Sequence, residues 1–119
     1  MKTSVLCPLV GFLMVTSPVL ADQHSTDIQQ SLYICERGVA IAATYINTSD
    51  GDSFAVVNAE GRQIAMRIVM SASGAKYAEA TGAVPYIWWT KGNAASFYVE
   101  GADIDDDLTL FKACRTIAE

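Results

Sequence analysis

The feature that most constrains the fold is a regular alternation of short apolar segments and turn sequences from residue 31 onward. The segments are rich in β-branched and aromatic residues, and no stretch has convincing helical periodicity. About eight strands, with about 12 residues for each strand and its turn, are typical of a small antiparallel sandwich or barrel. The expected strands span residues 32–35, 39–46, 54–57, 63–70, 76–80, 86–90, 94–99 and 108–113.

We favour an all-β fold in which eight antiparallel strands form a closed β-barrel, because closure removes exposed sheet edges. Strands this short should fill the barrel with their own side chains, which argues against a ligand cavity. Functional residues are therefore expected on the loops. Alternation within the fourth segment predicts one buried face, formed by Ile64, Met66, Ile68 and Met70.

The first 21 residues are predicted to be a secretory signal peptide. Lys2 precedes an apolar run over residues 5–15, and Ala21 is a small residue suited to cleavage. The run is well short of the roughly 20 residues that cross a bilayer, and no Cys follows the cleavage site as a lipid anchor would require. We expect a mature chain without a membrane anchor, with a flexible arm over residues 22–30 and one domain over residues 31–119.

Cleavage would make the chain smaller and more acidic. The full chain has 119 residues and a net charge of -5. Removal of residues 1–21 takes away one basic side chain and no acidic one, which leaves 98 residues and a charge of -6. Nucleic acid is an unsuitable partner, because phosphate binding requires clustered Lys and Arg. The acidic segment 103–107 lacks the Gly and the final carboxylate of a calcium-binding EF-hand loop, and is expected to be a solvated loop facing a basic partner.

Cysteine content predicts one disulfide. Cys7 lies within the signal peptide, so Cys35 and Cys114 remain as a pair in an oxidising compartment. Their bond would tie the first strand to the last and, on the chain-entropy model, stabilise the fold by roughly 4 to 5 kcal/mol. His24 is the only histidine, so four metal ligands cannot be assembled. We expect no metal and no cofactor.

Two segments combine a polar or charged residue with glycine. The first runs from Ser73 and Gly74 to Tyr77, and the second begins with Lys91 and Gly92. Glycine accepts positive φ, so each segment can form a tight exposed turn with a hydroxyl or an ammonium group at its tip. Taken alone, each is also compatible with an ordinary turn.

Together the two segments resemble signatures of a known family, the periplasmic and membrane-bound inhibitors of c-type lysozyme from Gram-negative bacteria. Ser-Gly-x-x-Tyr is present over residues 73–77, and Lys-Gly-x-x-Ala-x-(Leu/Phe) over residues 91–97. The Tyr-x-Cys at residues 33–35 and the closing Cys114 also resemble the family's disulfide frame. The resemblance spans almost the whole mature chain. The family's membrane-bound branch carries a lipidated Cys that this sequence lacks, so it is similar to the soluble periplasmic branch.

The resemblance implies a partner, a compartment and a mechanism. The partner is a c-type lysozyme, and the compartment is the periplasm. Ser73 would offer a hydroxyl hydrogen bond to a catalytic carboxylate, and Lys91 would pair its ammonium group with the carboxylates. Gly74 and Gly92 would shape the two loops, and Tyr77 would either contact lysozyme or support its loop. The chain would protect bacterial peptidoglycan and would not itself be an enzyme.

Two alternatives come from other functional classes. The Ser-x-x-Lys at residues 73–76 matches the nucleophile motif of penicillin-recognising enzymes, but the Ser-Asp-Asn element is absent and the chain is less than half the needed length. The other alternative is an envelope protein that binds a surface component through exposed aromatic residues, namely Tyr86, Trp88 and Trp89. The sequence leaves open whether the chain forms a homodimer.

Overall fold

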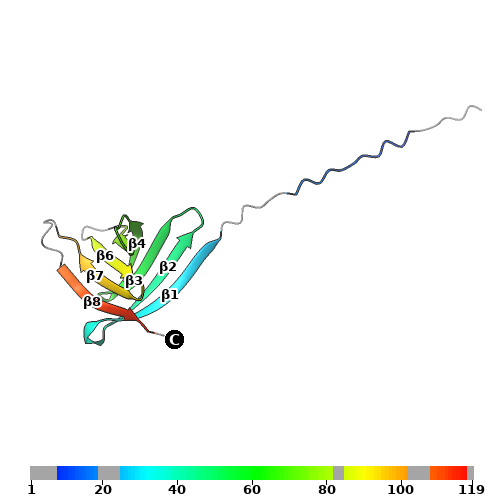
Figure 1. The fold of residues 1–119 in the computed structure, drawn as a ribbon. Coiled ribbons are helices and arrows are strands. Elements are labelled where there is room, and N and C mark those ends of the chain that lie inside the picture. The colour runs from blue at the N-terminus through cyan, green and yellow to red at the C-terminus, as the bar shows by residue number, and fades with distance from the viewer. Residues whose placement is uncertain (1–7, 19–24, 82–84, 102–107, 118–119) are drawn as a thin grey trace, which may run out of the picture.

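The computed structural model describes residues 8–18, 25–81, 85–101 and 108–117. Its eight strands form a closed antiparallel barrel in which each strand pairs with its sequence neighbours and the last returns to the first (Figure 1). The predicted all-β, eight-stranded antiparallel barrel is confirmed. The strands are β1 (Thr26–Ile34), β2 (Ala40–Thr48), β3 (Ser53–Ala59), β4 (Arg62–Val69), β5 (Ala75–Glu79), β6 (Tyr86–Lys91), β7 (Ala94–Val99) and β8 (Leu108–Thr116), with a 3-10 turn, η1 (Glu36–Gly38), after β1.

The first strand begins earlier than the sequence predicts. Residues 26–30, expected to belong to a flexible arm, form the first half of β1 and pair with β2 from Thr26↔Thr48 onward. Their side chains are all exposed, so this half of the strand has no buried face to produce an alternating pattern. Main-chain hydrogen bonds to β2 hold it instead. Residues 22–24 lie outside the described residues.

The barrel interior is filled by its own side chains, as expected. Trp88 is fully buried, and the Tyr33 ring meets it edge-on at a centroid distance of 5.0 Å. Ile64 and Met66 of β4 are buried as predicted, but Ile68 and Met70 are 38% and 97% exposed. That part of the prediction is wrong because β4 ends at Val69, so Met70 lies in a loop and Ile68 at the end of the strand.

A disulfide joins the end of the first strand to the last strand, as predicted. Cys35 directly follows β1 and bonds to Cys114 in β8 across 79 residues of sequence. In the described part of the chain, the ladder between β1 and β8 consists of Tyr33↔Thr116 and Ile34↔Arg115. The disulfide therefore reinforces the seam where the barrel has its shortest described ladder.

Residues 8–18 are extended and lie apart from the barrel (Figure 1). Their apolar side chains are exposed, with Leu9 at 97% and Phe12 at 86%, so this segment contributes nothing to the core. The predicted cleavage point at Ala21, and also His24 and the acidic segment 103–107, lie outside the described residues. No helix within the described ranges is long and apolar enough to cross a membrane.

Candidate functional site

The two motif segments lie side by side at one end of the barrel. Ser73 and Gly74 lie in the connection between β4 and β5, and Lys91 ends β6 just before the short turn that leads into β7. Strands β5 and β6 are neighbours, with Ala75 paired to Thr90 and Lys76 to Trp89. This register brings Gly74, at the end of the first loop, next to Lys91, at the start of the second.

Gly74 makes the contact between the two loops possible. It has a φ of 65°, and a Cβ atom added there would collide with the carbonyl oxygen of Thr90 and lie 2.8 Å from Cγ of Lys91. Gly92 has a φ of 56°, but an added Cβ would meet nothing within 4 Å. Gly74 is therefore required for packing as well as for backbone conformation, whereas Gly92 serves only the shape of its turn.

The Ser73 side chain is exposed while its main chain is held on two sides. Its carbonyl oxygen accepts hydrogen bonds from the Ser71 hydroxyl and from Nε1 of Trp89, the latter at 2.9 Å. Its amide nitrogen donates to Oγ of Ser71 at 3.3 Å. Within the described residues, the Ser73 hydroxyl itself has no hydrogen-bond partner, so it is available to a binding partner.

Two lysine side chains share one aromatic ring beside Ser73. Nζ of Lys91 lies 4.2 Å from the centroid of the Trp89 ring, and Nζ of Lys76 lies 5.4 Å from it. Among the described residues, neither ammonium forms a salt bridge. The site therefore presents two cations and an exposed hydroxyl on a chain whose net charge is negative.

Two depressions border the turn that follows Lys91. One, of about 280 Å³, lies at the mouth of the barrel and is mainly polar, with Gly92 and Asn93 on its rim. The other, of about 270 Å³, is lined by Trp89, Lys91 and small residues of β7 and β8. The turn thus stands between two hollows.

Tyr77 lies inside the barrel beneath the loops and is 4% exposed. Its hydroxyl lies 3.3 Å from Oγ of Ser53, which donates to Oδ1 of Asn47. Because the Ser53 proton is committed to Asn47, Tyr77 is the donor in this pair. The ring also lies near Tyr45, at a centroid distance of 5.7 Å. This geometry suits support of the loop.

A tyrosine pair continues this polar layer. The Tyr33 and Tyr45 hydroxyls share a hydrogen bond of 2.7 Å, and Nε1 of Trp88 donates to the Tyr45 oxygen at 2.8 Å. Burial raises the pKa of both phenols above the ordinary value of 10.0, and the Trp88 hydrogen bond opposes part of the rise at Tyr45. Both side chains are therefore neutral at physiological pH.

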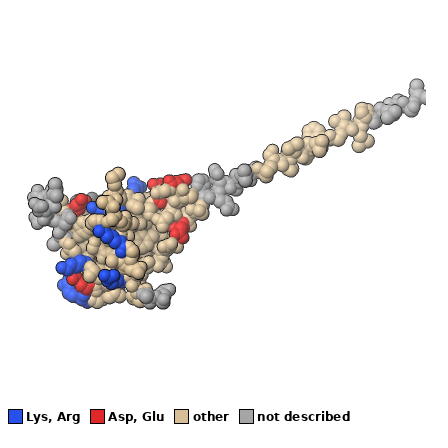
Figure 2. Space-filling view, in the orientation of Figure 1, with Lys and Arg blue, Asp and Glu red and all other residues tan. Residues whose placement is uncertain are grey.

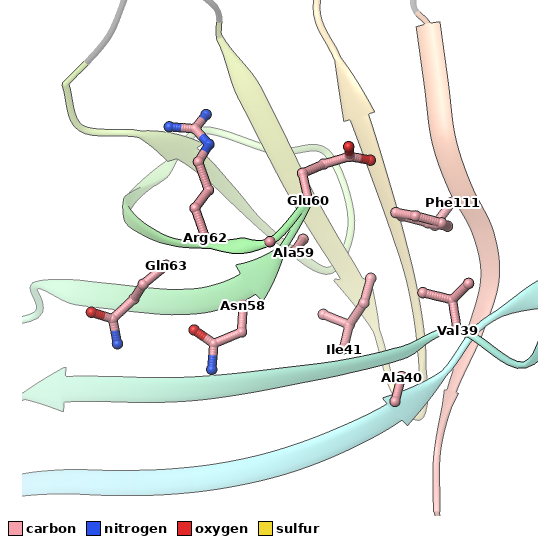
Figure 3. Close-up of a pocket in the computed structure, with 10 residues that line it drawn as sticks. Val39, Ala40, Ile41, Asn58, Ala59, Glu60, Arg62, Gln63 and Phe111 are labelled. Carbon is pink, nitrogen blue, oxygen red and sulfur yellow. The ribbon is translucent and has the colours of Figure 1, made fainter.

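A larger hollow of about 490 Å³ lies where the β1–β2 and β3–β4 connections meet β8 (Figure 3). Neither motif contributes to it. Ile41, Phe111 and Arg62 are among the residues that line it. The Arg62 guanidinium already pairs with Glu79 at 3.6 Å and lies 4.7 Å from the centroid of the Tyr86 ring.

The aromatic group proposed as an alternative interface is not a surface cluster. Trp88 is fully buried, and Tyr86 stacks on Phe97 with their rings nearly parallel at 5.3 Å. Only Trp89 faces the two motif loops. That alternative is wrong for Trp88, because successive residues of a strand point to opposite sides of the barrel wall.

The structure brings together four of the five predicted site residues, namely Ser73, Gly74, Lys91 and Gly92. Trp89 and Lys76 complete the group. The sequence suggests Trp89 only for the alternative aromatic interface and Lys76 only as part of the Ser-x-x-Lys motif, and neither as part of a lysozyme-binding site. One signal could have found them. Cross-strand pairing of Lys76 with Trp89, and the two-residue spacing from Trp89 to Lys91, place all three on one face of the sheet.

These features define a class of protein, a small disulfide-linked β-barrel that presents Ser and Lys from two adjoining loops. The model of the family described as membrane-bound lysozyme-inhibitor of c-type lysozyme matches residues 33–106. The chain belongs to this family.

Two curated relatives are described as membrane-bound lysozyme inhibitors of C-type lysozyme. The relative from Pseudomonas aeruginosa is 36% identical over 89 residues, which cover 75% of this chain and 63% of the relative. The relative from Cupriavidus necator is 35% identical over 66 residues, which cover 56% and 49%. The matched segments therefore span less than two thirds of the length of either relative.

Two solved structures share the barrel. The periplasmic lysozyme inhibitor of C-type lysozyme from Salmonella typhimurium superposes with a TM-score of 0.67 and 27% identity, covering 77% of this chain and all of that one. The Pseudomonas aeruginosa inhibitor MliC, crystallised in complex with hen egg white lysozyme, superposes with a TM-score of 0.59 and 30% identity over 98% of each chain. These relatives are named as inhibitors, not as enzymes.

Proposed function

We propose that this chain inhibits c-type lysozyme by inserting Ser73 and Lys91 into the enzyme's active-site cleft. The observation that carries the proposal is the packing of Gly74 against Thr90 and Lys91, which presents the two motif loops as one surface. Family membership supports the same function, as does the structural relative crystallised with hen egg white lysozyme.

The chemistry of the two side chains suits a glycosidase cleft. Such a cleft contains a general acid, whose pKa is raised so that it stays protonated, and an ionised carboxylate. An ammonium group held close to the general acid favours its ionised form and so opposes the raised pKa. The exposed Ser73 hydroxyl can donate to a carboxylate oxygen, while the loops exclude the sugar.

Distribution of charge fits a basic partner. In the face shown in Figure 2, acidic side chains gather near the end of the barrel where β1 begins and β2 meets β3, the region of Asp27, Asp50 and Asp52. Lys and Arg lie mainly elsewhere on that face. A net charge of -6 on the mature chain would speed encounter with a cationic enzyme, an effect that weakens with added salt.

The remaining motif residues would act through the loops. Gly74 permits the close packing, Gly92 allows the turn, and Tyr77 supports the first loop from inside the barrel. Export follows from the predicted signal peptide with cleavage after Ala21. A Cys35–Cys114 disulfide suits the oxidising periplasm, where the inhibitor would protect peptidoglycan.

A lysis assay tests the proposal. Residues 22–119 are added to bacterial cell walls with hen egg white lysozyme, and we expect inhibition at micromolar protein or below. A parallel reaction uses an amidase, which cleaves the same walls at a different bond. Inhibition of lysozyme alone supports binding in its cleft. Inhibition of both enzymes would show that the chain coats the wall, and inhibition of neither would overturn the proposal.

A further inference from the structure

Trp89 belongs to neither motif, but its side chain contacts both motif loops. It lies partly exposed on the outer face of β6 and is paired with Lys76 on the neighbouring strand β5. Its Nε1 reaches the Ser73 carbonyl oxygen at 2.9 Å, and its ring lies beside the Lys91 ammonium. A single side chain thus contacts the main chain of one functional residue and the charged end of the other.

We infer that Trp89 is a positioning residue that joins the Ser73 loop and the Lys91 turn into one preformed binding unit. The effect on lysozyme affinity rests on the proposed function. The effect on the free protein does not.

The hydrogen bond from Trp89 anchors the first loop to the barrel. The side-chain hydrogen bonds of Ser71 lie within the loop and cannot fix its position relative to β6. Trp89 bonds across 16 residues of sequence. Together with the close approach of Gly74 to Thr90, it holds the Ser73 backbone at a defined place beside the second turn.

The ring of Trp89 restricts the lysine side chains. A mobile lysine side chain loses conformational entropy when it is ordered on binding. An aromatic face that holds the ammonium group beforehand reduces that loss. Lys91 at 4.2 Å is in the range of a cation–π contact, and Lys76 at 5.4 Å lies on the same ring. Lys76 also lies 5.8 Å from the Tyr98 ring centroid. The cation that we expect to enter the lysozyme cleft is therefore already held next to Ser73.

Binding measurements with two substitutions separate the two contacts. Trp89→Leu removes both the hydrogen bond and the ring, and should weaken lysozyme binding about tenfold. Trp89→Phe keeps a ring for the lysines but loses the donor, and should weaken binding about threefold. In a background with Ser73→Ala and Lys91→Ala, the same substitutions should change binding less than twofold, because the two side chains that we propose enter the cleft are absent.

Comparison of the Trp89 substitutions in the two backgrounds distinguishes a positioning role from general support of the fold. A purely structural role would weaken binding equally in both backgrounds, and that result would overturn the inference. Should Trp89→Leu fail to fold, Trp89→Phe tests the hydrogen-bond contact in the same two backgrounds.

The free protein provides a readout that needs no lysozyme. The Lys91 methylene protons should show upfield ring-current shifts in NMR spectra, and these shifts should disappear in Trp89→Leu. Lys112, on β8, serves as the reference lysine. Random-coil shifts for Lys91 in the parent would overturn the inference. Ring-current shifts in a parent chain that fails to bind lysozyme would overturn the proposed function and leave the positioning role intact.

Discussion

The carbonyl oxygen of Thr90 occupies the space into which a side chain at Gly74 would extend. This contact joins two loops that are far apart in sequence. It also makes the two motif glycines different in kind, although both have positive φ, because an added Cβ at Gly92 would enter open space.

Substitution of the two glycines should therefore give unequal results. Gly92→Ala is strained only by its backbone conformation, at a cost of about 1 to 2 kcal/mol. Gly74→Ala must in addition displace the first loop from β6, so it should weaken lysozyme inhibition at least fivefold more than Gly92→Ala. Inhibition constants and urea unfolding of both variants check this. Equal loss of inhibition would show that the loops do not need to touch.

Removal of the two side chains that we propose enter the lysozyme cleft should weaken inhibition without unfolding the barrel. Ser73 and Lys91 are exposed and absent from the core, so the Ser73→Ala, Lys91→Ala double variant should keep the parent circular dichroism spectrum. We expect its inhibition constant to rise at least tenfold, or about 1.4 kcal/mol. Lys112→Ala, an exposed lysine on β8, is the matched control and should inhibit as the parent does. A double variant as potent as the parent would rule out insertion of these residues.

High pH should destabilise the barrel through its buried tyrosines. Tyr33 and Tyr45 ionise near pH 10.0 when unfolded, but burial raises their pKa in the folded state. Above pH 10 the unfolded chain binds fewer protons, so the free energy of unfolding falls as pH rises, by up to about 1.4 kcal/mol per pH unit for each tyrosine. Below pH 10 both tyrosines are protonated in the folded and the unfolded chain, so this loss of stability does not occur.

Tyr33→Phe isolates this effect because Tyr45 can still accept from Trp88. Urea unfolding at pH 8 and pH 11 should show a smaller loss of stability in the variant than in the parent. An equal loss in both proteins would show that Tyr33 does not contribute to the pH dependence.

Loss of the disulfide should destabilise the fold strongly. The Cys35–Cys114 bond closes a loop across 79 residues of sequence, which on the chain-entropy model contributes roughly 4 to 5 kcal/mol to the free energy of unfolding. The Cys35→Ser, Cys114→Ser variant should therefore unfold at much lower urea than the oxidised parent. The parent treated with a reductant should unfold at the same urea concentration as the variant. A midpoint unchanged by either treatment would contradict the assigned role of the bond.

The outer edge of β1 is where we expect two copies of the chain to associate. Among the described residues, Thr26–Ser31 pair only with β2. Ile28 within this segment and Leu32 just after it are 63% and 45% exposed. An unprotected strand edge favours pairing with another strand. Light scattering should detect dimers of the parent at high concentration and fewer of Ile28→Lys, whereas Val69→Lys on β4 should behave as the parent. A parent that stays monomeric at millimolar concentration would contradict this.

Strand positions were predictable because most strands bury only one face. Alternation and turn residues located β3, β5 and β7 to within two residues of their observed ends. The first half of β1 was missed because both of its faces are exposed, so main-chain pairing alone holds it. Exposure of Ile68 and Met70 depends on where β4 ends, and the apolar character of those residues does not indicate that point.

Motif residues were predictable, but their arrangement was not. Sequence signatures single out Ser73 and Lys91 as candidates, whereas their adjacency depends on the pairing of β5 with β6. Trp89 was the harder case. Residues 86–89 are all apolar, so a period of two cannot show which of the two tryptophans faces the core.

That ambiguity has a consequence for how the protein tolerates insertions and deletions. Strand β6 carries the central core indole of Trp88 and, one position later, the indole that contacts both loops. A shift by a single residue would exchange their environments. Misalignment of β6 would thus take the Trp88 indole out of the core and the Trp89 indole away from the two loops. A register error in this one strand would therefore alter the core and the loop contacts together.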